Sequence, residues 1–99
     1  MAWILFTVPN GRRGDLDTVL GDDQLARQSR TIRDAASAGG PAGELYVLME
    51  GSSEAIARAE GLLAPVGRRL PPVEAEPVYR RLKDEEENAS AGMGLFFTE

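Results

Sequence analysis

The stretch "ELYVLMEG", Glu44–Gly51, decides the fold that we expect for this chain. Its interior is a short unbroken apolar run, which is typical of a strand in the middle of a sheet. A second apolar run, "AWILFTV", Ala2–Val8, is rich in β-branched and aromatic residues and stops at the turn signal that begins with Pro9. We predict that this second run is a strand buried on both faces. We also predict that the two strands lie side by side in one sheet.

Helical patterns lie on both sides of Glu44–Gly51. The preceding segment "DQLARQSRTIRDAASAGG" has apolar residues at helical spacing, which predicts a helix over about 22–38 that an aspartate caps and Gly39 ends. An extended "RTIRDAAS" is the alternative, so residues 29–37 remain open between helix and strand. After Gly51, a serine caps a second helix, whose buried stripe comprises Ile56, Ala59, Leu63 and Val66.

The C-terminal third is predicted as a short strand, a surface helix and a last strand. The segment "RRLPP" fits only a short edge strand, because proline cannot donate a hydrogen bond to a neighbouring strand. Proline is favoured in the first turn of a helix, so we expect a helix over Pro77–Ser90 that buries Val78 and Leu82. The apolar segment Met93–Phe97 is predicted to be the last strand.

These elements predict one α/β domain over residues 1–99, of the α+β class. Helices that cover one face of a small sheet give a two-layer α/β sandwich. Any large apolar side chains on the helix-free face would then form an interface. A domain of this size buries a smaller fraction of its surface than a large domain does, and pairing with a second copy offsets that, so we expect a homodimer.

Composition excludes several classes of function. The formal net charge is −5, which argues against nucleic acids and anionic membranes as partners. The chain has no cysteine and no histidine, so it lacks the common general base and the most reactive nucleophile. We therefore expect a protein without catalytic residues, metal ions or cofactors. The four acidic side chains of Asp84–Glu87 point in several directions on a helix, so they cannot converge on one metal ion. They fit a solvated helix face. "AWILFTV" is too short to span a membrane, and we expect a cytoplasmic protein.

The loop after the first strand is the candidate ligand site. In "PNGRRGDL", Pro9–Leu16, the glycines permit unusual backbone angles and the arginines offer paired donors to an anion. The alternative is an ordinary solvated turn. We treat the Arg-Gly-Asp triplet within this loop as a chance match. The residues predicted to bind a ligand are Asn10, Gly11, Arg12, Arg13 and Gly14.

Two segments resemble the ACT-type regulatory domains. They are "GDLDTVL", Gly14–Leu20, after the apolar first strand, and the later "ELYVLMEGSSEAIARAEGLLAPVGRRL". The resemblance implies a ferredoxin-like βαββαβ sandwich that pairs side by side. It also implies an amino-acid-like effector bound near the first loop, where Asn10, Gly11, Arg13 and Gly14 would line the site. Ferredoxin-like dimeric α+β barrels share the same pattern.

Three functional hypotheses follow. The first is a non-enzymatic, self-associating module that binds a small anionic or amino-acid-like ligand at the first loop. The second is a structural or interaction protein without a small ligand, which uses the apolar sheet face or the helix Pro77–Ser90. The third is a small cofactor-independent enzyme of the dimeric-barrel type.

Overall fold

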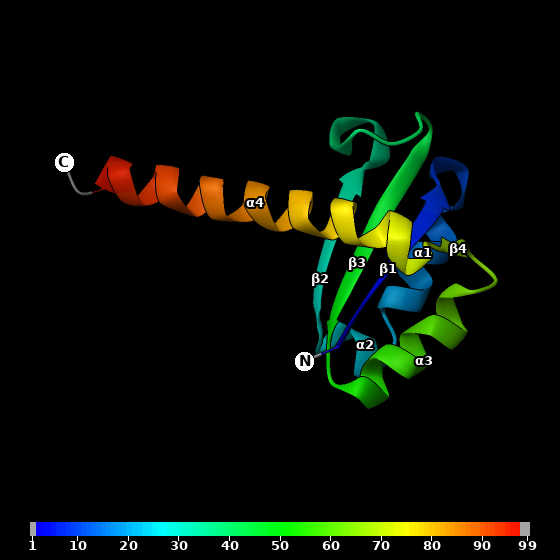
Figure 1. Ribbon diagram of the computed structural model, residues 1–99. Coiled ribbons are helices and arrows are strands. Elements are labelled where there is room, and N and C mark those ends of the chain that lie inside the picture. The colour runs from blue at the N-terminus through cyan, green and yellow to red at the C-terminus, as the bar shows by residue number, and fades with distance from the viewer. Residues whose placement is uncertain (1, 98–99) are drawn as a thin grey trace.

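The computed structural model describes the backbone of residues 2–97 and the side chains of residues 2–84. Figure 1 shows a small sheet with short helices on one side and a long helix that crosses its other side. The elements in chain order are β1 Ala2–Pro9, the 3-10 turn η1 Asn10–Arg12, α1 Arg13–Leu20, α2 Asp23–Ala26, β2 Ser29–Asp34, the 3-10 turn η2 Ala35–Ala38, β3 Glu44–Gly51, α3 Ser53–Leu63, β4 Arg68–Arg69 and α4 Pro72–Phe97.

The sheet is antiparallel and has the strand order β2-β3-β1-β4. The two central strands pair along their whole length, from Ala2 opposite Gly51 to Pro9 opposite Glu44. The prediction that these two apolar segments lie side by side is therefore confirmed. The short edge strand in "RRLPP" is also confirmed, because β4 comprises only Arg68–Arg69. The mixture of one antiparallel sheet with helices confirms the α+β class.

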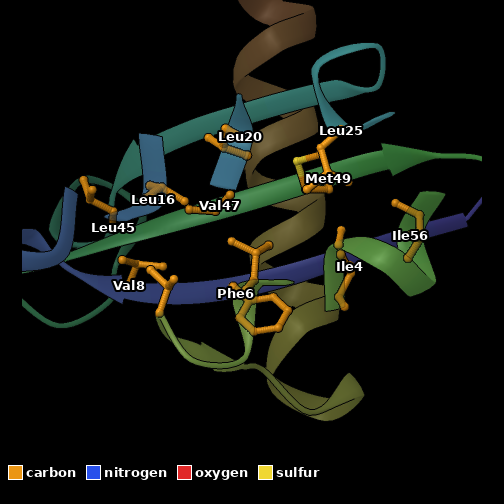
Figure 2. Packing of buried hydrophobic residues seen from close by; sticks show 13 residues of the cluster. Ile4, Phe6, Val8, Leu16, Leu20, Leu25, Leu45, Val47, Met49 and Ile56 are labelled. Atoms are coloured by element: carbon orange, nitrogen blue, oxygen red, sulfur yellow. The ribbon is translucent and has the colours of Figure 1, made fainter. Parts of the chain in front are cut away.

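One face of the sheet carries the larger core. Figure 2 shows side chains of alternate residues of β1 and β3 directed toward the short helices α1, α2 and α3. Every second residue of a strand points to the same face of the sheet, so one alternating set of residues in β1 and β3 fills this core. Its buried members are Ile4, Phe6, Val8, Leu16, Leu20, Leu25, Leu45, Val47, Met49, Ile56, Ala59, Leu63 and Val66.

The opposite face is covered by α4, so the prediction of helices on one face only is wrong. Leu5 and Leu48, at intervening positions of β1 and β3, are at most 1% exposed. They pack with Tyr46, Leu70 and the small residues of η2 beneath α4. The α4 side chains in this second cluster are Ala75, Val78, Tyr79 and Leu82, which we call the inner stripe of α4. The physical reason is that large apolar side chains on both faces of a strand need cover on both sides.

The predicted helix over 22–38 is wrong in its second half. The helix that Asp22 caps, α2, is only four residues long, and Ser29–Asp34 forms the edge strand β2. The extended alternative is therefore the correct one. Thr31 and Ile32 pair with Leu48 and Val47 of β3, and β-branched side chains suit such pairing. Gly39 adopts the left-handed conformation that its sequence position predicts, but it ends η2 rather than a long helix.

The predicted last strand at Met93–Phe97 is also wrong, because α4 continues to Phe97. The helix begins at Pro72, five residues before the expected start, and Pro77 lies inside it. A proline there lacks the N–H that would bond to the carbonyl of Val73, and the packing of the inner stripe offsets that loss. Within the described residues, no helix has the length and apolar character that a membrane span requires.

Gly67 and Gly61 give a matched pair of stability predictions. A Cβ on Gly67 would collide with the carbonyl oxygen of Thr7 and lie 2.7 Å from Cγ2 of Val8. We expect Gly67→Ala to lower the free energy of unfolding by about 1–3 kcal/mol, because the backbone of β1 must shift. A Cβ on Gly61, within α3, meets no atom within 4 Å. Gly61→Ala should instead raise the free energy of unfolding by up to about 1 kcal/mol. Urea unfolding of both variants checks the pair, and a neutral Gly67→Ala would contradict it.

Candidate functional site

The first loop forms a continuous helical entry rather than an open turn. Asn10–Arg12 is a 3-10 turn that runs directly into α1, and the backbone N–H of Asn10 donates to the carbonyl of Gly43 at 2.9 Å. Among the described residues, positive φ angles occur only at Gly39 and Gly43. Gly11 and Gly14 therefore do not use the left-handed freedom that motivated their place in the predicted site.

Both arginines of the loop contact carboxylates of α1. Nε of Arg12 lies 2.9 Å from Oδ2 of Asp15, and Nε of Arg13 lies 3.2 Å from Oδ1 of Asp17. The side chains of Arg12 and Arg13 are about half exposed, so these ion pairs are weak and can exchange with a ligand. The spacings of three and four residues are visible in the sequence, and they would have predicted these pairs.

The two arginines line different cavities. Arg12 lies beside a shallow cavity of about 280 Å³ whose lining includes Thr7, Glu44 and Arg68. Arg13 lies beside another cavity, of about 300 Å³, with residues of β2 and η2. Of the five residues predicted to bind a ligand, Asn10, Gly11 and Gly14 contribute to neither lining. The loop therefore does not converge on one ligand, and the two cavities have to be considered separately.

The Arg12 cavity brings both signs of charge together, and we call it the mixed-charge cavity. Arg12 comes from η1 and Arg68 from β4, whereas Glu44 begins β3. Oγ1 of Thr7 donates to Oε1 of Glu44 at 2.7 Å, which fixes this carboxylate at the cavity wall. Nη1 of Arg68 lies 3.8 Å from Oε2 of Glu74, a long contact that leaves the side chain 63% exposed.

Sequence reasoning missed most of this cavity. Thr7, Glu44 and Arg68 are far apart in the chain and meet because β1 pairs with both β3 and β4. Thr7 lies opposite Arg68 in the β1–β4 pair, and opposite residues point to the same face of a sheet. The signal that could have found them is the strand pairing itself, which no local pattern encodes.

A second polar group lies under α4. Glu50 of β3 is 8% exposed and accepts hydrogen bonds from the hydroxyl of Tyr79 at 3.2 Å and from Nζ of Lys83 at 3.0 Å. The ring of Tyr79 stacks on Trp3 of β1 with a centroid distance of 4.3 Å. Because each carboxylate oxygen of Glu50 accepts a hydrogen bond from α4, we interpret this group as one that holds α4 on the sheet.

Tyr46 does not line any of the cavities described above. Tyr46 is 6% exposed and packs within the second core cluster. Its hydroxyl lies against Gly40, where an added Cβ would collide with it. The contact explains why a residue without a side chain occupies position 40.

Asp22 and Arg58 form a clamp between α2 and α3. Nη2 and Nε of Arg58 donate to the two carboxylate oxygens of Asp22 at 2.7 and 2.9 Å. Asp22 also accepts from the backbone N–H groups of Gln24 and Leu25 as the N-cap of α2. The hydrogen bond from Arg58, helped by these backbone donors, lowers the pKa of Asp22 from 3.8 to about 2.

This clamp gives a pH prediction. A carboxyl whose pKa is lower in the folded state stabilises the fold above its unfolded pKa, and this stabilisation is lost as protonation proceeds at lower pH. We expect the contribution of Asp22 to be complete above about pH 4 and to disappear as the pH falls toward about 2. Asp22→Asn keeps an N-cap but removes the charge. Denaturant titrations of both proteins should show a difference in stability at neutral pH that vanishes near pH 2, whereas a constant difference would contradict the assignment.

Metal binding is not indicated by the part of the chain whose side chains are described. In that part, no three His, Cys, Asp or Glu residues gather in a way that could hold a metal ion. Most of the predicted solvated acidic run Asp84–Glu87 lies outside the described side chains.

No family model matches the chain, and the searches of curated proteins and of solved structures also give no match.

Proposed function

We propose that this chain is a non-enzymatic, self-associating module that binds a small amino-acid-like ligand in the mixed-charge cavity. The observation that carries the proposal is the pair of guanidinium groups, Arg12 and Arg68, beside the fixed carboxylate of Glu44. A ligand carboxylate suits the guanidinium groups, which donate paired hydrogen bonds. A ligand ammonium group suits Glu44. The cavity volume of about 280 Å³ lies just below the usual range for ligand pockets and fits a small molecule.

We further propose that the fold is ferredoxin-like and related to the ACT-type domains, with α4 as an addition. The element order supports this proposal, because β1, α1, β2, β3, α3 and β4 follow the βαββαβ sequence of that architecture once α2 is counted with α1. The central position of β1 and β3 in the sheet supports it as well.

The other two hypotheses receive less support. In a dimeric barrel, one face of each sheet packs against the other sheet, but here α4 covers the face of Leu5 and Leu48. The second hypothesis uses the helix Pro77–Ser90, but Val78 and Leu82 of this helix do not face a partner. Leu82 is 1% exposed and belongs, with the partly buried Val78, to the core beneath α4. Loss of these side chains would loosen α4 rather than release a partner.

A ligand screen with matched variants tests the proposed function. The twenty common amino acids, their α-keto acids and simple amines are screened by thermal shift. A ligand at one hundred times its dissociation constant should stabilise the fold by about 2.7 kcal/mol. We expect Arg68→Gln to abolish the response, because it removes a guanidinium from the mixed-charge cavity. Arg13→Gln is the control, because Arg13 lines the other cavity.

Glu44→Gln separates two ligand classes. If the ligand is an amino acid, this variant should weaken binding of amino acids more than binding of the α-keto acids, which lack the ammonium group. Equal effects on both classes would show that the cavity selects simple anions. The proposal is wrong if no compound shifts the melting temperature, or if Arg13→Gln abolishes the shift and Arg68→Gln does not.

A further inference from the structure

The helix α4 is longer than the sheet that it covers. Among the side chains that the structure describes, Leu82 is the last member of the inner stripe, and the helical backbone continues to Phe97. Figure 1 shows this second half passing the edge at β2 and projecting away from the body. At 1.5 Å per residue, the segment 84–97 is about 20 Å long. We call this segment the arm, and it accounts for the long 47 Å dimension of the molecule.

The composition of the arm does not favour a helix in isolation. It contains Gly92 and Gly94 together with Asn88 and Ser90, and these residues have lower helix propensity than alanine. Helices of this length are marginal in water even when their residues are good helix formers. The arm therefore needs a packing partner if its helix is to persist.

The outer face of α4 offers a surface for such packing. Val73, Glu76, Pro77 and Arg80 line a shallow cavity of about 320 Å³ on this helix, away from the inner stripe. Val73 is 81% exposed and is the large hydrophobic residue that stands out as exposed among the described side chains. The arm of the same chain cannot reach this surface, because both are parts of one continuous helix.

The charges along α4 favour a second copy of the same helix as the partner. The exposed Arg80 and Arg81 form a basic block, and Asp84 and Glu85 form an acidic block one helical turn later. When two such helices lie antiparallel about a twofold axis, the basic block of each faces the acidic block of the other. A parallel arrangement would place like charges opposite one another. Isologous contacts of this kind are the commonest basis of homodimers.

We propose that two copies of this chain associate through antiparallel α4 helices. Each arm lies along the outer face of the partner's α4, with the basic block opposite the acidic block, and passes over the surface at Val73 and Pro77. This proposal rests on the self-association included in the proposed function, and it assigns the interface. It is independent of the mixed-charge cavity, to which α4 contributes no lining residue.

A charge exchange tests this interface in the full chain. One variant carries Arg80→Glu and Arg81→Glu, and the other carries Asp84→Lys and Glu85→Lys. Each variant alone places like charges across the interface, so we expect its dimer dissociation constant to rise at least tenfold above that of the wild type. An equimolar mixture restores opposite charges at both ends, so it should form a heterodimer with an affinity close to that of the wild type. Analytical ultracentrifugation over a concentration series measures all four samples.

The outcomes separate the interface from self-association in general. A wild-type chain that stays monomeric at all concentrations overturns both the self-association and the α4 interface. Variants that dimerise as tightly as the wild type, or a mixture that stays monomeric, overturn the interface only. Circular dichroism and melting temperature establish that the variants are folded. If either double variant unfolds, the single substitutions Arg80→Glu and Asp84→Lys, at two exposed positions, replace the pairs under the same criteria. Thermal shift with the amino-acid panel measures ligand binding in every variant, independently of dimerisation.

Discussion

Phe6→Ala is expected to lower the free energy of unfolding by about 3–5 kcal/mol, a large part of the total stability of a small domain. Phe6 is 2% exposed and lies in the core between the sheet and the short helices. Figure 2 shows its ring beside β1, between the labelled side chains of Ile4 and Val8. The loss combines the transfer energy of the ring with the cavity that the surrounding residues cannot fill. Chemical unfolding with circular dichroism as the signal measures it.

Val73→Ala is the control for this loss. Val73 is 81% exposed, so its truncation creates no cavity in the monomer and should change the free energy of unfolding by no more than about 0.5 kcal/mol. A Phe6→Ala variant as stable as Val73→Ala would show that the two central strands do not enclose this core.

Lys83→Met carries the second large expected effect, a loss of about 2–3 kcal/mol. The substitution leaves the buried carboxylate of Glu50 without its cationic partner, and Tyr79 alone then donates to it. Removing one partner of a buried ion pair is costly because the remaining charge is uncompensated. The part-exposed position of Lys83, whose side chain is 39% accessible, keeps the loss below that of a fully buried pair.

The double variant Glu50→Leu with Lys83→Met distinguishes this cause from lost packing. It removes both charges and keeps apolar volume, so it should recover most of the stability that Lys83→Met alone loses. A double-mutant cycle by urea unfolding gives the coupling energy between the two positions. If the double variant is less stable than either single variant, the buried charge is not the cause of the loss.

The central strands were predictable because their signal is local. Ala2–Val8 and Glu44–Gly51 are continuous apolar runs with clear ends, and such runs need no information from elsewhere in the chain. The segment 22–38 shows the opposite case. Its cap at Asp22 and its glycine at Gly39 both behave as their local chemistry requires. Between them, Ser29–Asp34 forms β2 because β3 offers an edge to pair with, and this pairing is a tertiary contact that no local pattern shows.

The position of α4 could have been inferred from the strands rather than from the helix. A strand predicted to be buried on both faces requires cover on both sides of the sheet, which conflicts with helices on one face only. Leu5 and Leu48 are the side chains that need this cover, and Ala75 and Leu82 of α4 provide it. Its own pattern predicted a surface helix, since the stripe is narrow and charged residues surround it.

The candidate site was only partly accessible to sequence reasoning. Arg12 was selected for its charge, and it does line the mixed-charge cavity. The glycines were selected for backbone angles that they do not adopt. Thr7, Glu44 and Arg68 could not be selected, because strand pairing alone brings them together.

The place of α4 in the chain has a consequence for biosynthesis. All four strands precede α4 in the sequence, so the ribosome completes the sheet before it makes the helix that covers Leu5, Tyr46 and Leu48. Domains fold during synthesis on the timescale of elongation, and nascent sheets with uncovered apolar faces are prone to aggregate. Premature termination anywhere between Pro72 and Leu82 would therefore release a chain whose apolar sheet face is uncovered. Such a chain would be prone to aggregate, and chaperones would bind it.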